Sequence, residues 1–521
     1  MSRTALGAAW VAALTALWVY VRTLSPTVAW VNMGEDSGDL LSASATLGIA
    51  HPTGYPLFVL LGRVASLLPV GATAFRINLI AALAGAASVF FLARLVLELT
   101  RSRDGDAAPS DGAGPLVAAL AAAAAYAFSR GAWSQSVLAE VYSLNAAFFG
   151  AVLWACARAD RARSPRHLAL AAFLLGLGLT NHLLLLAAGP AVLVTAWRLR
   201  ATRSIGGAML VLLPLLLLWG ISLDLYLPIR AWRSPEFSWG VPATPKQLWW
   251  VLSGAQYERH FFARGWPEVV HHLLPGRWIL DFGWGLLVLA LGWAALAWRR
   301  PGGLAAPGAA FLTSLALLSA YSIPDDVGYW MPVLFLACAL AGVGWAALWR
   351  AVPRRAIRGT VAVATLGVGA LGVAANFHAV DASQDVRPWV WAHRNLEAVE
   401  PNALIVSEYD GRTFALWFYK ATDFARTRPG LVVIYKYLLV WPWYQHHLAR
   451  VYPTLAMPPY PGDMDAMMNR LIARNIKRRP VYLIRKDPAL LPIFTLSPVG
   501  YAPDPIYRVG LKDESSVPGN P

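Results

Sequence analysis

Charged residues are scarce in this chain, and cysteine is nearly absent. Asp, Glu, Lys and Arg make up 14% of the 521 residues, against 57% hydrophobic residues, whereas an ordinary soluble domain has about 25% charged residues. So little charge, with a mean hydropathy of +0.49, excludes a typical soluble enzyme and indicates a polytopic membrane protein. The two cysteines, Cys156 and Cys338, both lie in apolar stretches, so no disulfide framework can be inferred.

Acidic residues are fewer than basic ones, and the formal net charge is +15. A basic excess can indicate nucleic-acid binding, but here the arginines gather in short clusters between apolar segments. These clusters lie within 101–103, 158–166, 198–203, 299–300 and 350–358. Such clusters are typical of cytoplasmic anchors under the positive-inside rule, so we expect membrane lipids as partners and no nucleic acid.

Long apolar runs predict about eleven transmembrane helices, because a spanning helix needs roughly 20 mostly apolar residues. The predicted spans are 5–22, 76–99, 115–128, 138–157, 168–180, 183–197, 205–227, 278–298, 305–321, 331–349 and 359–376. The first has no small-residue cleavage site after it, so we interpret it as a retained helix. A cytoplasmic N-terminus then places every arginine cluster on the cytoplasmic side.

The two long external loops and the C-terminal part have a different composition. In the loop 23–75, YPLFVLLGRVASLL is too short to span and predicts an interfacial helix. From about residue 377, short apolar runs such as ALIVSEY and PVYLIR alternate with helix-like segments such as DMDAMMNRLIARNI. We therefore predict a transmembrane domain over 1–376 and a small extracytoplasmic α/β domain over 377–521.

The first external loop concentrates polar residues beside the membrane, where carboxylates are costly unless they serve an ion, a proton or a polar substrate. It contains Glu35, Asp36, Asp39, His51 and Tyr55. Other acids near the external ends of spans are Glu140, Asp224, Asp281, Asp325 and Asp326, and possible partners on the same face are Arg130, Asn181, His182, Arg230 and Tyr257. A site that joins carboxylates to cations can bind a lipid-borne phosphate and activate a hydroxyl.

Structural roles compete with each of these functional interpretations. Asp36 or Ser37 is suited to cap a helix, and His51 in HPTGYP fits a turn between two prolines. Arg230 fits a membrane-surface anchor, Glu140 complements a helix N-terminus, and Asn181 with His182 fits a helix reversal. Asp410 and Arg412 in SEYDGRT are typical of a turn after a strand.

Several sequence blocks, in order, resemble a known family. They are PTVAWVNMGEDSGDLLSASATLGIAHPTGYPLFVLLGRVASLLP, WSQSVLAEVYSLN, GLGLTNH and YLPIRAWRSPEFSWGVPATPKQLWWVLSGAQY, with weaker traces in NALIVSEYDGRTFALWFY and WPWYQHHL. The chain resembles bacterial relatives of an endoplasmic-reticulum transmembrane protein O-mannosyltransferase, within the type-C (GT-C) glycosyltransferases. The family pattern has Glu where this chain has Asp39, and a second Pro where it has Thr53.

The resemblance implies a GT-C-like, multi-pass enzyme of the bacterial inner membrane. Such an enzyme transfers a sugar, such as mannose, from a polyprenyl-phosphate donor to a hydroxyl of an extracytoplasmic protein, glycan or lipid. An essential acid in the first external loop of the superfamily matches Asp36, which we expect to act as general base with Glu35 or Asp39 beside it. Substrate contacts are expected from the other residues of the predicted site, namely Asp39, His51, Tyr55, Glu140, His182, Arg230 and Tyr257.

Two further expectations concern metals and transport. Carboxylates can hold Mg²⁺ or Mn²⁺, but no ligand spacing here is diagnostic, so we expect no obligatory metal. A flippase or other secondary transporter would also place acids within a membrane. Transporters tend to have midplane acids and inverted repeats, whereas these acids lie at one face and no repeat is visible, which favours an enzyme.

Overall fold

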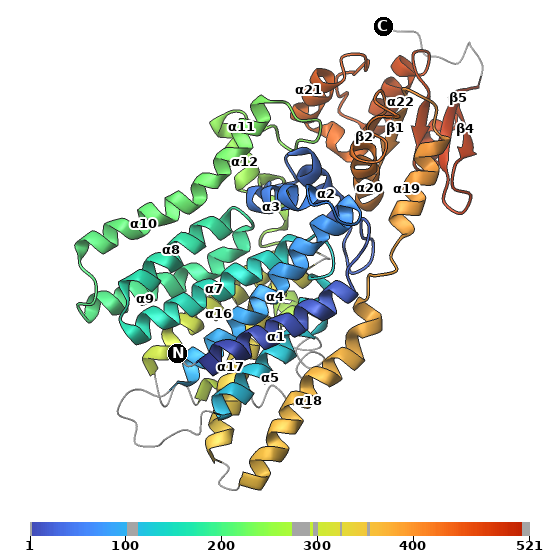
Figure 1. Cartoon of the computed structure of the whole chain (residues 1–521). Helices are drawn as coiled ribbons and strands as arrows, with labels where there is room; N and C mark the ends of the chain where they lie inside the picture. The colour runs from blue at the N-terminus through green and yellow to red at the C-terminus, as the bar shows by residue number, and fades with distance from the viewer. Residues whose placement is uncertain are drawn as a thin grey trace. The chain divides into compact units, whose positions relative to one another are not determined.

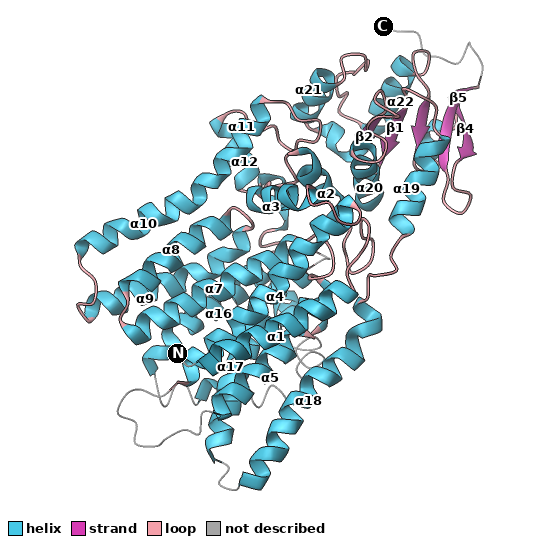
Figure 2. Ribbon diagram, viewed as in Figure 1, coloured by secondary structure: helices cyan, strands magenta, loops and turns pink. Residues whose placement is uncertain are grey.

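The protein is described from a computed structural model that is mainly helical, and the strands among the residues it describes lie towards the C-terminus (Figure 2). The structure describes residues 3–101, 113–273, 292–294, 301–323, 326–351 and 355–512. Internal contacts divide the chain into two compact units. The helical unit comprises Met1–Leu24, Asn78–Asp224 and Tyr257–Ser383, and the mixed unit comprises Ser25–Ile77, Leu225–Gln256 and Gln384–Pro521. The domain boundary between 376 and 377 stays a prediction.

The helical unit takes its shape from runs rich in Ala and Leu, which favour helix and bury no polar side-chain group. Its helices are α1 (Arg3–Arg22), most of α4 (Thr73–Thr100), α5 (Ala113–Ala127), α6 (Arg130–Ser134), α7 (Val141–Ala162), α8 (Pro165–Leu179), η1 (Leu183–Ala188), α9 (Gly189–Ala201), α10 (Gly207–Ile221), η2 (Ser222–Leu225), η3 (Ala255–His260), α13 (Trp266–Leu273), α16 (Pro301–Ala320), α17 (Val327–Ala351) and α18 (Arg355–Val380).

Seven helical segments in the described part of the chain are long and apolar enough to cross a membrane. They are Arg3–Arg22, Thr73–Thr100, Val141–Ala162, Leu183–Ala201, Gly207–Trp232, Gly303–Ala320 and Val327–Ala351. Shorter apolar helices cover Pro56–Ser66, Ala113–Ala127, Pro165–Leu179 and Gly367–Val380. A helix therefore occupies every predicted span except 278–298, most of which lies outside the described residues, and the polytopic helical class is confirmed.

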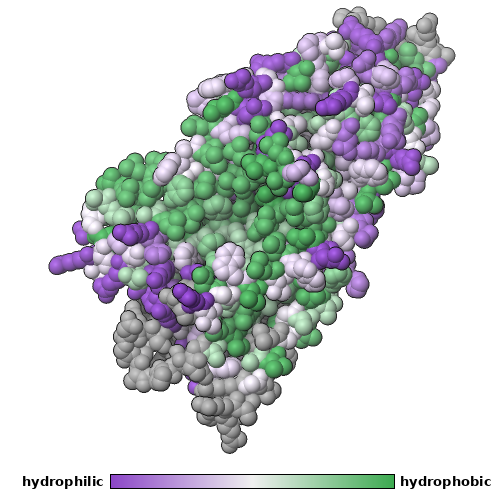
Figure 3. Space-filling model, in the orientation of Figure 1, coloured by the Kyte–Doolittle hydropathy of each residue, from purple (hydrophilic) through white to green (hydrophobic). Residues whose placement is uncertain are grey.

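Glycine allows one pair of helices in the helical unit to pack at close range. Helices α8 and α10 run side by side (Figure 1). A Cβ added to Gly176 of α8 would lie 2.1 Å from the carbonyl oxygen of Leu217, and one added to Gly220 of α10 would lie 2.3 Å from the amide nitrogen of Leu177. Small residues let membrane helices approach closely and gain van der Waals contact. Apolar side chains cover this region of the surface (Figure 3).

The mixed unit joins three distant stretches of sequence around one sheet. Its helices are α2 (Ser37–Thr46), α3 (Pro56–Ser66), α11 (Tyr226–Trp232), α12 (Pro245–Leu252), α19 (Arg387–Ala398), α20 (Asp410–Ala421), η4 (Lys436–Val440), α21 (Pro442–Val451), α22 (Met464–Asn475) and η5 (Pro488–Leu490). Its strands are β1 (Leu404–Ser407), β2 (Val432–Tyr435), β3 (Val481–Leu483), β4 (Phe494–Val499) and β5 (Ile506–Leu511). The predicted C-terminal α/β architecture and the short helix after Tyr55 are confirmed.

The five strands are arranged in the order β2-β1-β3-β5-β4. Strand β1 pairs in parallel with both β2 and β3, whereas β5 runs antiparallel to β3 and β4. The parallel strands β1, β2 and β3 consist wholly of buried residues, LIVS, VVIY and VYL, as expected for strands covered on both faces. Their carboxyl ends therefore lie at the same edge of the sheet.

The first loop is fastened to the C-terminal segment inside the mixed unit. The carboxylate of Asp385 accepts hydrogen bonds from the backbone amides of Trp30 and Val31 at 2.9 and 3.2 Å. Helix α2 packs on α20 so closely that a Cβ on Gly38 would lie 2.7 Å from the backbone of Phe414. These contacts place the acidic loop predicted from the sequence against the sheet domain.

The α8–α10 contact predicts a position-specific effect of a single methyl group. Gly176→Ala adds a Cβ that clashes with the backbone of α10, so we expect a stability loss of roughly 1–3 kcal/mol from overpacking. Gly189→Ala is the matched control, because nothing lies within 4 Å of its added Cβ. The measurement is the thermal unfolding midpoint in detergent micelles. Equal midpoints for the two variants would contradict the close helix contact.

Candidate active site

Asp39 is the most completely bonded acid of the first loop. Its side chain is 1% exposed. One carboxylate oxygen accepts hydrogen bonds from the backbone amide and from Nδ1 of His51, both at 2.8 Å, and the other accepts one from Nε1 of Trp239 at 3.0 Å. A buried carboxylate is tolerated when such donors satisfy it. Asp39 therefore fixes the position of the histidine ring and leaves Nε2 as the ring nitrogen that faces other groups.

His51 lies between two carboxylates. Its Nδ1 is bonded to Asp39, and its Nε2 lies 3.8 Å from Oδ2 of Asp36. Burial disfavours the charged ring, but the charges of Asp36 and Asp39 outweigh it and raise the pKa of His51 to about 9. The imidazole is therefore a cation at neutral pH, rather than only the turn residue that HPTGYP allows.

Asp36 is the more accessible member of this group, with a side chain 49% exposed. It precedes α2 but makes no side-chain capping hydrogen bond, so its carboxylate is not committed to the helix. The partial burial of this carboxylate raises the pKa of Asp36, the charge of His51 lowers it, and the charges of Asp39 and Glu35 raise it. An accessible carboxylate with a raised pKa is suited to accept a proton.

The turn that carries His51 is held by residues of the segment 226–239. Arg230 donates from Nε to the carbonyl of Leu47 at 2.6 Å, and the hydroxyl of Tyr226 donates to the carbonyl of Gly48 at 2.6 Å. Ile49 exchanges backbone hydrogen bonds with the segment that carries Trp239. One guanidinium nitrogen of Arg230 thus supports the loop directly, which is a structural task in addition to the phosphate contact predicted for it.

Tyr55 and Glu35 border the same centre. The ring of Tyr55 meets that of His51 edge to face at a centroid distance of 4.9 Å, and its hydroxyl donates to the carbonyl of Pro52 at 3.0 Å. Glu35 is exposed and its side chain passes close to Gly411. Both residues are therefore within the cluster that the sequence predicted.

Asp410 and Tyr435 join the centre from the sheet domain. Asp410 begins α20, and its carboxylate accepts a hydrogen bond from the hydroxyl of Tyr435 at the end of β2. Burial raises the pKa of Asp410, and the charge of Asp36 adds to this effect. The turn motif SEYDGRT favoured a structural interpretation of Asp410, so the sequence underestimated it. The available signal was an acid at the carboxyl end of a predicted buried strand.

The remaining predicted residues belong to the helical unit. His182 accepts a hydrogen bond from the amide of Leu184 at 3.0 Å, and its ring meets those of Tyr142 and Tyr329 at 5.3 and 5.7 Å. Glu140 is 6% exposed and directly precedes α7, and Tyr257 lies in η3. Asp281 and Asp325 lie outside the described residues. The site roles of all these residues stay predictions.

No group of three or more His, Cys, Asp or Glu side chains is arranged to hold a metal ion in the part of the chain that the structure describes. The centre itself offers two reactive groups, the carboxylate of Asp36 and the imidazolium of His51. Together they can accept a proton and stabilise a developing negative charge within one small space.

Sequence comparison gives this site a family context. Residues 36–204 match the model of a family described as the protein O-mannosyl-transferase TMEM260 N-terminal domain. This stretch is similar to that N-terminal domain. It contains Asp36, Asp39, His51, Tyr55, Glu140 and His182 among the predicted site residues, and Arg230 and Tyr257 follow it.

Two proteins with TMEM260 names show the same likeness. Over 221 residues the chain is 34% identical to the protein O-mannosyl-transferase TMEM260 of Mus musculus, covering 40% of this chain and 29% of the mouse protein. Over 190 residues it is 28% identical to the corresponding Dictyostelium discoideum protein, covering 33% of this chain and 21% of that protein. The chain thus matches less than a third of either relative. The resemblance to this transferase family is confirmed.

Solved structures of ArnT from Cupriavidus metallidurans share the fold. The structure bound to undecaprenyl phosphate gives a TM-score of 0.62 at 13% identity and covers 100% of both chains. The apo structure gives a TM-score of 0.59 at 13% identity and covers 98% of both chains. The predicted GT-C-like membrane fold with a small C-terminal sheet domain is therefore confirmed.

The charged His51–Asp39 pair predicts a pH-dependent contribution to stability. Because the folded-state pKa of His51 is about 9 and that of an unfolded histidine is roughly 6.5, the contribution is fully present below about pH 6.5 and is lost as the pH rises through about 9. We expect Asp39→Asn to destabilise the protein most at the acidic end of this window. The measurement is the free energy of unfolding in denaturant between about pH 6 and about pH 10.

Asp465→Asn is the control, because Asp465 is an exposed acid on α22 and should give a small, flat difference. A destabilisation by Asp39→Asn that stays constant across the whole pH window would show that His51 is uncharged in the folded protein.

Proposed function

We propose that this protein is a membrane glycosyltransferase that transfers a sugar from a polyprenyl-phosphate donor to the hydroxyl of an extracytoplasmic acceptor. The observation that carries the proposal is the grouping of Asp36, His51 and Asp39 within the TMEM260-type stretch. The transferase names of the relatives support the activity, and the fold shared with an undecaprenyl-phosphate-bound ArnT supports a lipid-phosphate donor. The names of those relatives favour a protein hydroxyl as the acceptor and mannose as the transferred sugar.

Asp36 is the general base of the proposed reaction. Its carboxylate accepts the proton of the acceptor hydroxyl while the hydroxyl oxygen forms a bond to the anomeric carbon of the sugar. The raised pKa of Asp36 brings its basicity closer to what proton transfer near neutral pH requires. A single displacement of this kind inverts the configuration at the anomeric carbon.

His51 stabilises the leaving group. As the bond between the anomeric carbon and the phosphate oxygen breaks, its electron pair passes to the lipid phosphate, which gains negative charge. The imidazolium of His51, held by Asp39, is a fixed cation beside the base, and such preorganised charge favours the transition state. Arg230 and His182 are further proposed contacts for the donor phosphate.

We also propose that the reaction needs no obligatory divalent metal. A lipid monophosphate leaves with less charge than a diphosphate, and His51 supplies a permanent cation at neutral pH. Turnover that disappears with a chelator and returns with Mn²⁺ in the assay below would refute this part of the proposal.

The proposed base predicts the effect of one isosteric substitution. Asp36→Asn removes the proton acceptor and keeps the shape, so turnover should fall by about a hundred- to ten-thousandfold, with little change in thermal stability because Asp36 makes no capping bond. The assay measures release of lipid phosphate by protein in nanodiscs supplied with a panel of polyprenyl-phosphate sugars and acceptor hydroxyls. Asp465→Asn should retain wild-type turnover.

Equal turnover by wild type and Asp36→Asn would remove Asp36 from the mechanism. If the wild type transfers no sugar from any donor but moves a lipid-linked sugar or another solute across sealed vesicles, the protein is a transporter instead.

The proposed orientation places the N-terminus in the cytoplasm and the mixed unit outside a bacterial inner membrane. It can be tested with single cysteines because Cys156 and Cys338 are both buried. A membrane-impermeant maleimide applied to intact cells should label Ala398→Cys, at the exposed end of α19, and should label Arg200→Cys, at the end of α9, only after permeabilisation. The reverse pattern would invert the topology.

A further inference from the structure

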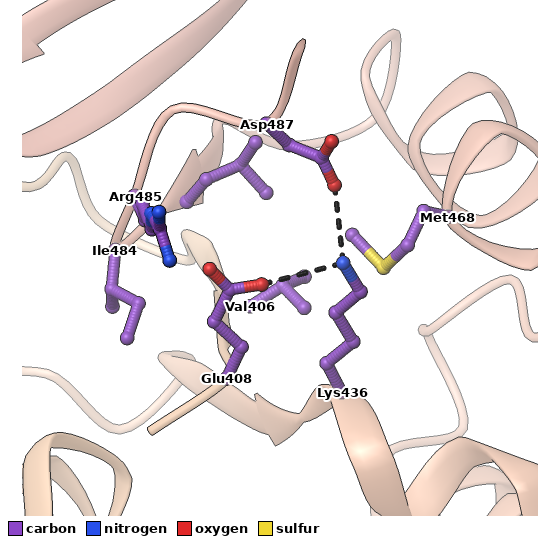
Figure 4. Close-up of a pocket in the computed structure, with 8 residues that line it drawn as sticks. Val406, Glu408, Lys436, Met468, Ile484, Arg485 and Asp487 are labelled. Carbon is purple, nitrogen blue, oxygen red and sulfur yellow. Dashed lines mark hydrogen bonds and ion pairs between the residues drawn. The ribbon is translucent and has the colours of Figure 1, made fainter. Parts of the chain in front are cut away.

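One buried carboxylate near the ends of α4 and α7 serves two arginines. The side chain of Glu98 is 2% exposed, and it pairs with Arg158 at 3.5 Å and with Arg161, both in the last part of α7. Two positive charges therefore share a single negative charge. The balance is the reverse of that in the sheet domain, where the ammonium of Lys436 lies between two carboxylates (Figure 4).

Arg94 adds a third positive charge. It precedes Glu98 by about one helical turn on α4, and it is close enough to interact electrostatically with both Glu98 and Arg158. Its guanidinium lies over the rings of Phe90 and Trp154, 5.6 and 4.9 Å from their centroids. Cation–π contacts of this kind fix the position of a guanidinium but leave its charge in place. Arg94 is therefore held beside an acid that two other arginines already share.

We call Arg94, Glu98, Arg158 and Arg161 the α4–α7 arginine cluster. Its three arginines and one glutamate give a formal charge of +2. Nε of Arg94 and Nε1 of the neighbouring Trp154 are both buried and donate to no residue that the structure describes. Buried donors without acceptors are costly, and so is an uncompensated charge within a membrane helix. Arg94 as a whole is only partly buried, so an anionic ligand can reach its guanidinium and compensate the charge.

The surroundings of Arg94 favour a lipid over a soluble anion. Arg94 lies six residues before the end of α4, about 9 Å along the helix axis, in a segment long and apolar enough to cross a membrane. Phe90, one turn further into this segment, contacts Trp10 of α1 at a centroid distance of 4.7 Å, and Trp10 is 52% exposed. Leu14 of α1 is exposed as well. An anion bound at Arg94 therefore has apolar surface beside it that acyl chains can cover.

We propose that the α4–α7 arginine cluster binds the headgroup phosphate of an anionic phospholipid, in the membrane leaflet at which α4 and α7 end. Arg94 donates to the phosphate oxygens, Arg158 adds charge, and the acyl chains lie along Phe90 and Trp10. Arginine suits this contact because its planar guanidinium can donate two parallel hydrogen bonds to a phosphate. Basic pockets between membrane helices bind anionic headgroups in this way. The inference goes beyond the proposed transfer reaction, because it concerns lipid binding alone.

The test measures binding of phosphatidylglycerol to the full-length protein, released from detergent micelles, by native mass spectrometry. We expect the wild type to bind it about tenfold more tightly than phosphatidylcholine, because the positive choline group of the latter cancels the phosphate charge. Arg94→Gln should weaken phosphatidylglycerol binding by roughly tenfold or more, because it removes a charged donor. Arg200→Gln, at an exposed position near the end of α9, is the matched control. It removes the same charge and should bind phosphatidylglycerol as the wild type does.

Thermal unfolding of each variant establishes that it is folded. If Arg94→Gln does not fold, Arg158→Gln decides the result. It should weaken phosphatidylglycerol binding by roughly three- to tenfold, a smaller loss because Arg158 already pairs with Glu98.

Three results would overturn the proposal. One is that the wild type binds phosphatidylglycerol and phosphatidylcholine equally. Another is that Arg94→Gln, or Arg158→Gln in its place, weakens binding no more than Arg200→Gln does, which would reduce the effect to the overall positive charge of the protein. A third is that inorganic phosphate displaces phosphatidylglycerol as well as added phosphatidylglycerol does, which would make the cluster a site for a soluble anion.

Discussion

The hydrogen bonds to Asp39 are the constraint on which the centre depends. A carboxylate that is 1% exposed is stable only with partners, and Asp39 obtains them from the turn that carries His51 and from Trp239. Together with Asp36, the buried acid makes His51 a cation, and its hydrogen bond directs the second ring nitrogen of His51 towards Asp36. The charge of the histidine in turn allows an accessible acid to sit beside two others. The hydrogen bonds that stabilise the buried Asp39 are therefore the same ones that position and charge His51.

The C-terminal sheet domain contributes side chains to the centre. Directly after β1 come Glu408, which pairs with Lys436, and Asp410, which belongs to the centre. At the end of β2, Tyr435 donates a hydrogen bond to Asp410, and the next residue, Lys436, pairs with Glu408. Each of these two adjacent strands thus places one side chain in the centre and one in the ion pair of Lys436 with Glu408. The geometry couples the centre to the sheet through short stretches of backbone.

The sequence predicted the elements that depend on local pattern and missed those that depend on distant packing. The length of apolar runs predicts spans and buried strands. The acidic loop beside a span predicts a site at Glu35, Asp36, Asp39 and His51, because carboxylates next to a membrane are costly and this cost can be inferred from the sequence alone. Trp239 lies in one of the blocks that resemble the family, but its bond to an acid 200 positions away leaves no local pattern. The loop-supporting bond of Arg230 and the place of Asp410 were hidden for the same reason. A linear division of the chain likewise has no means to represent a unit built from three separated segments.

The mixed unit is completed last, since Ser25–Ile77 must wait for Leu225–Gln256 and then for Gln384–Pro521. While the ribosome is still translating, the acidic loop has neither Trp239 nor the Asp410–Tyr435 pair beside it. A truncated or partly inserted chain therefore lacks a finished centre, whatever its membrane helices have achieved. The groups of the centre can therefore come together only after the chain has been translated past Tyr435, far beyond the loop that carries Asp36.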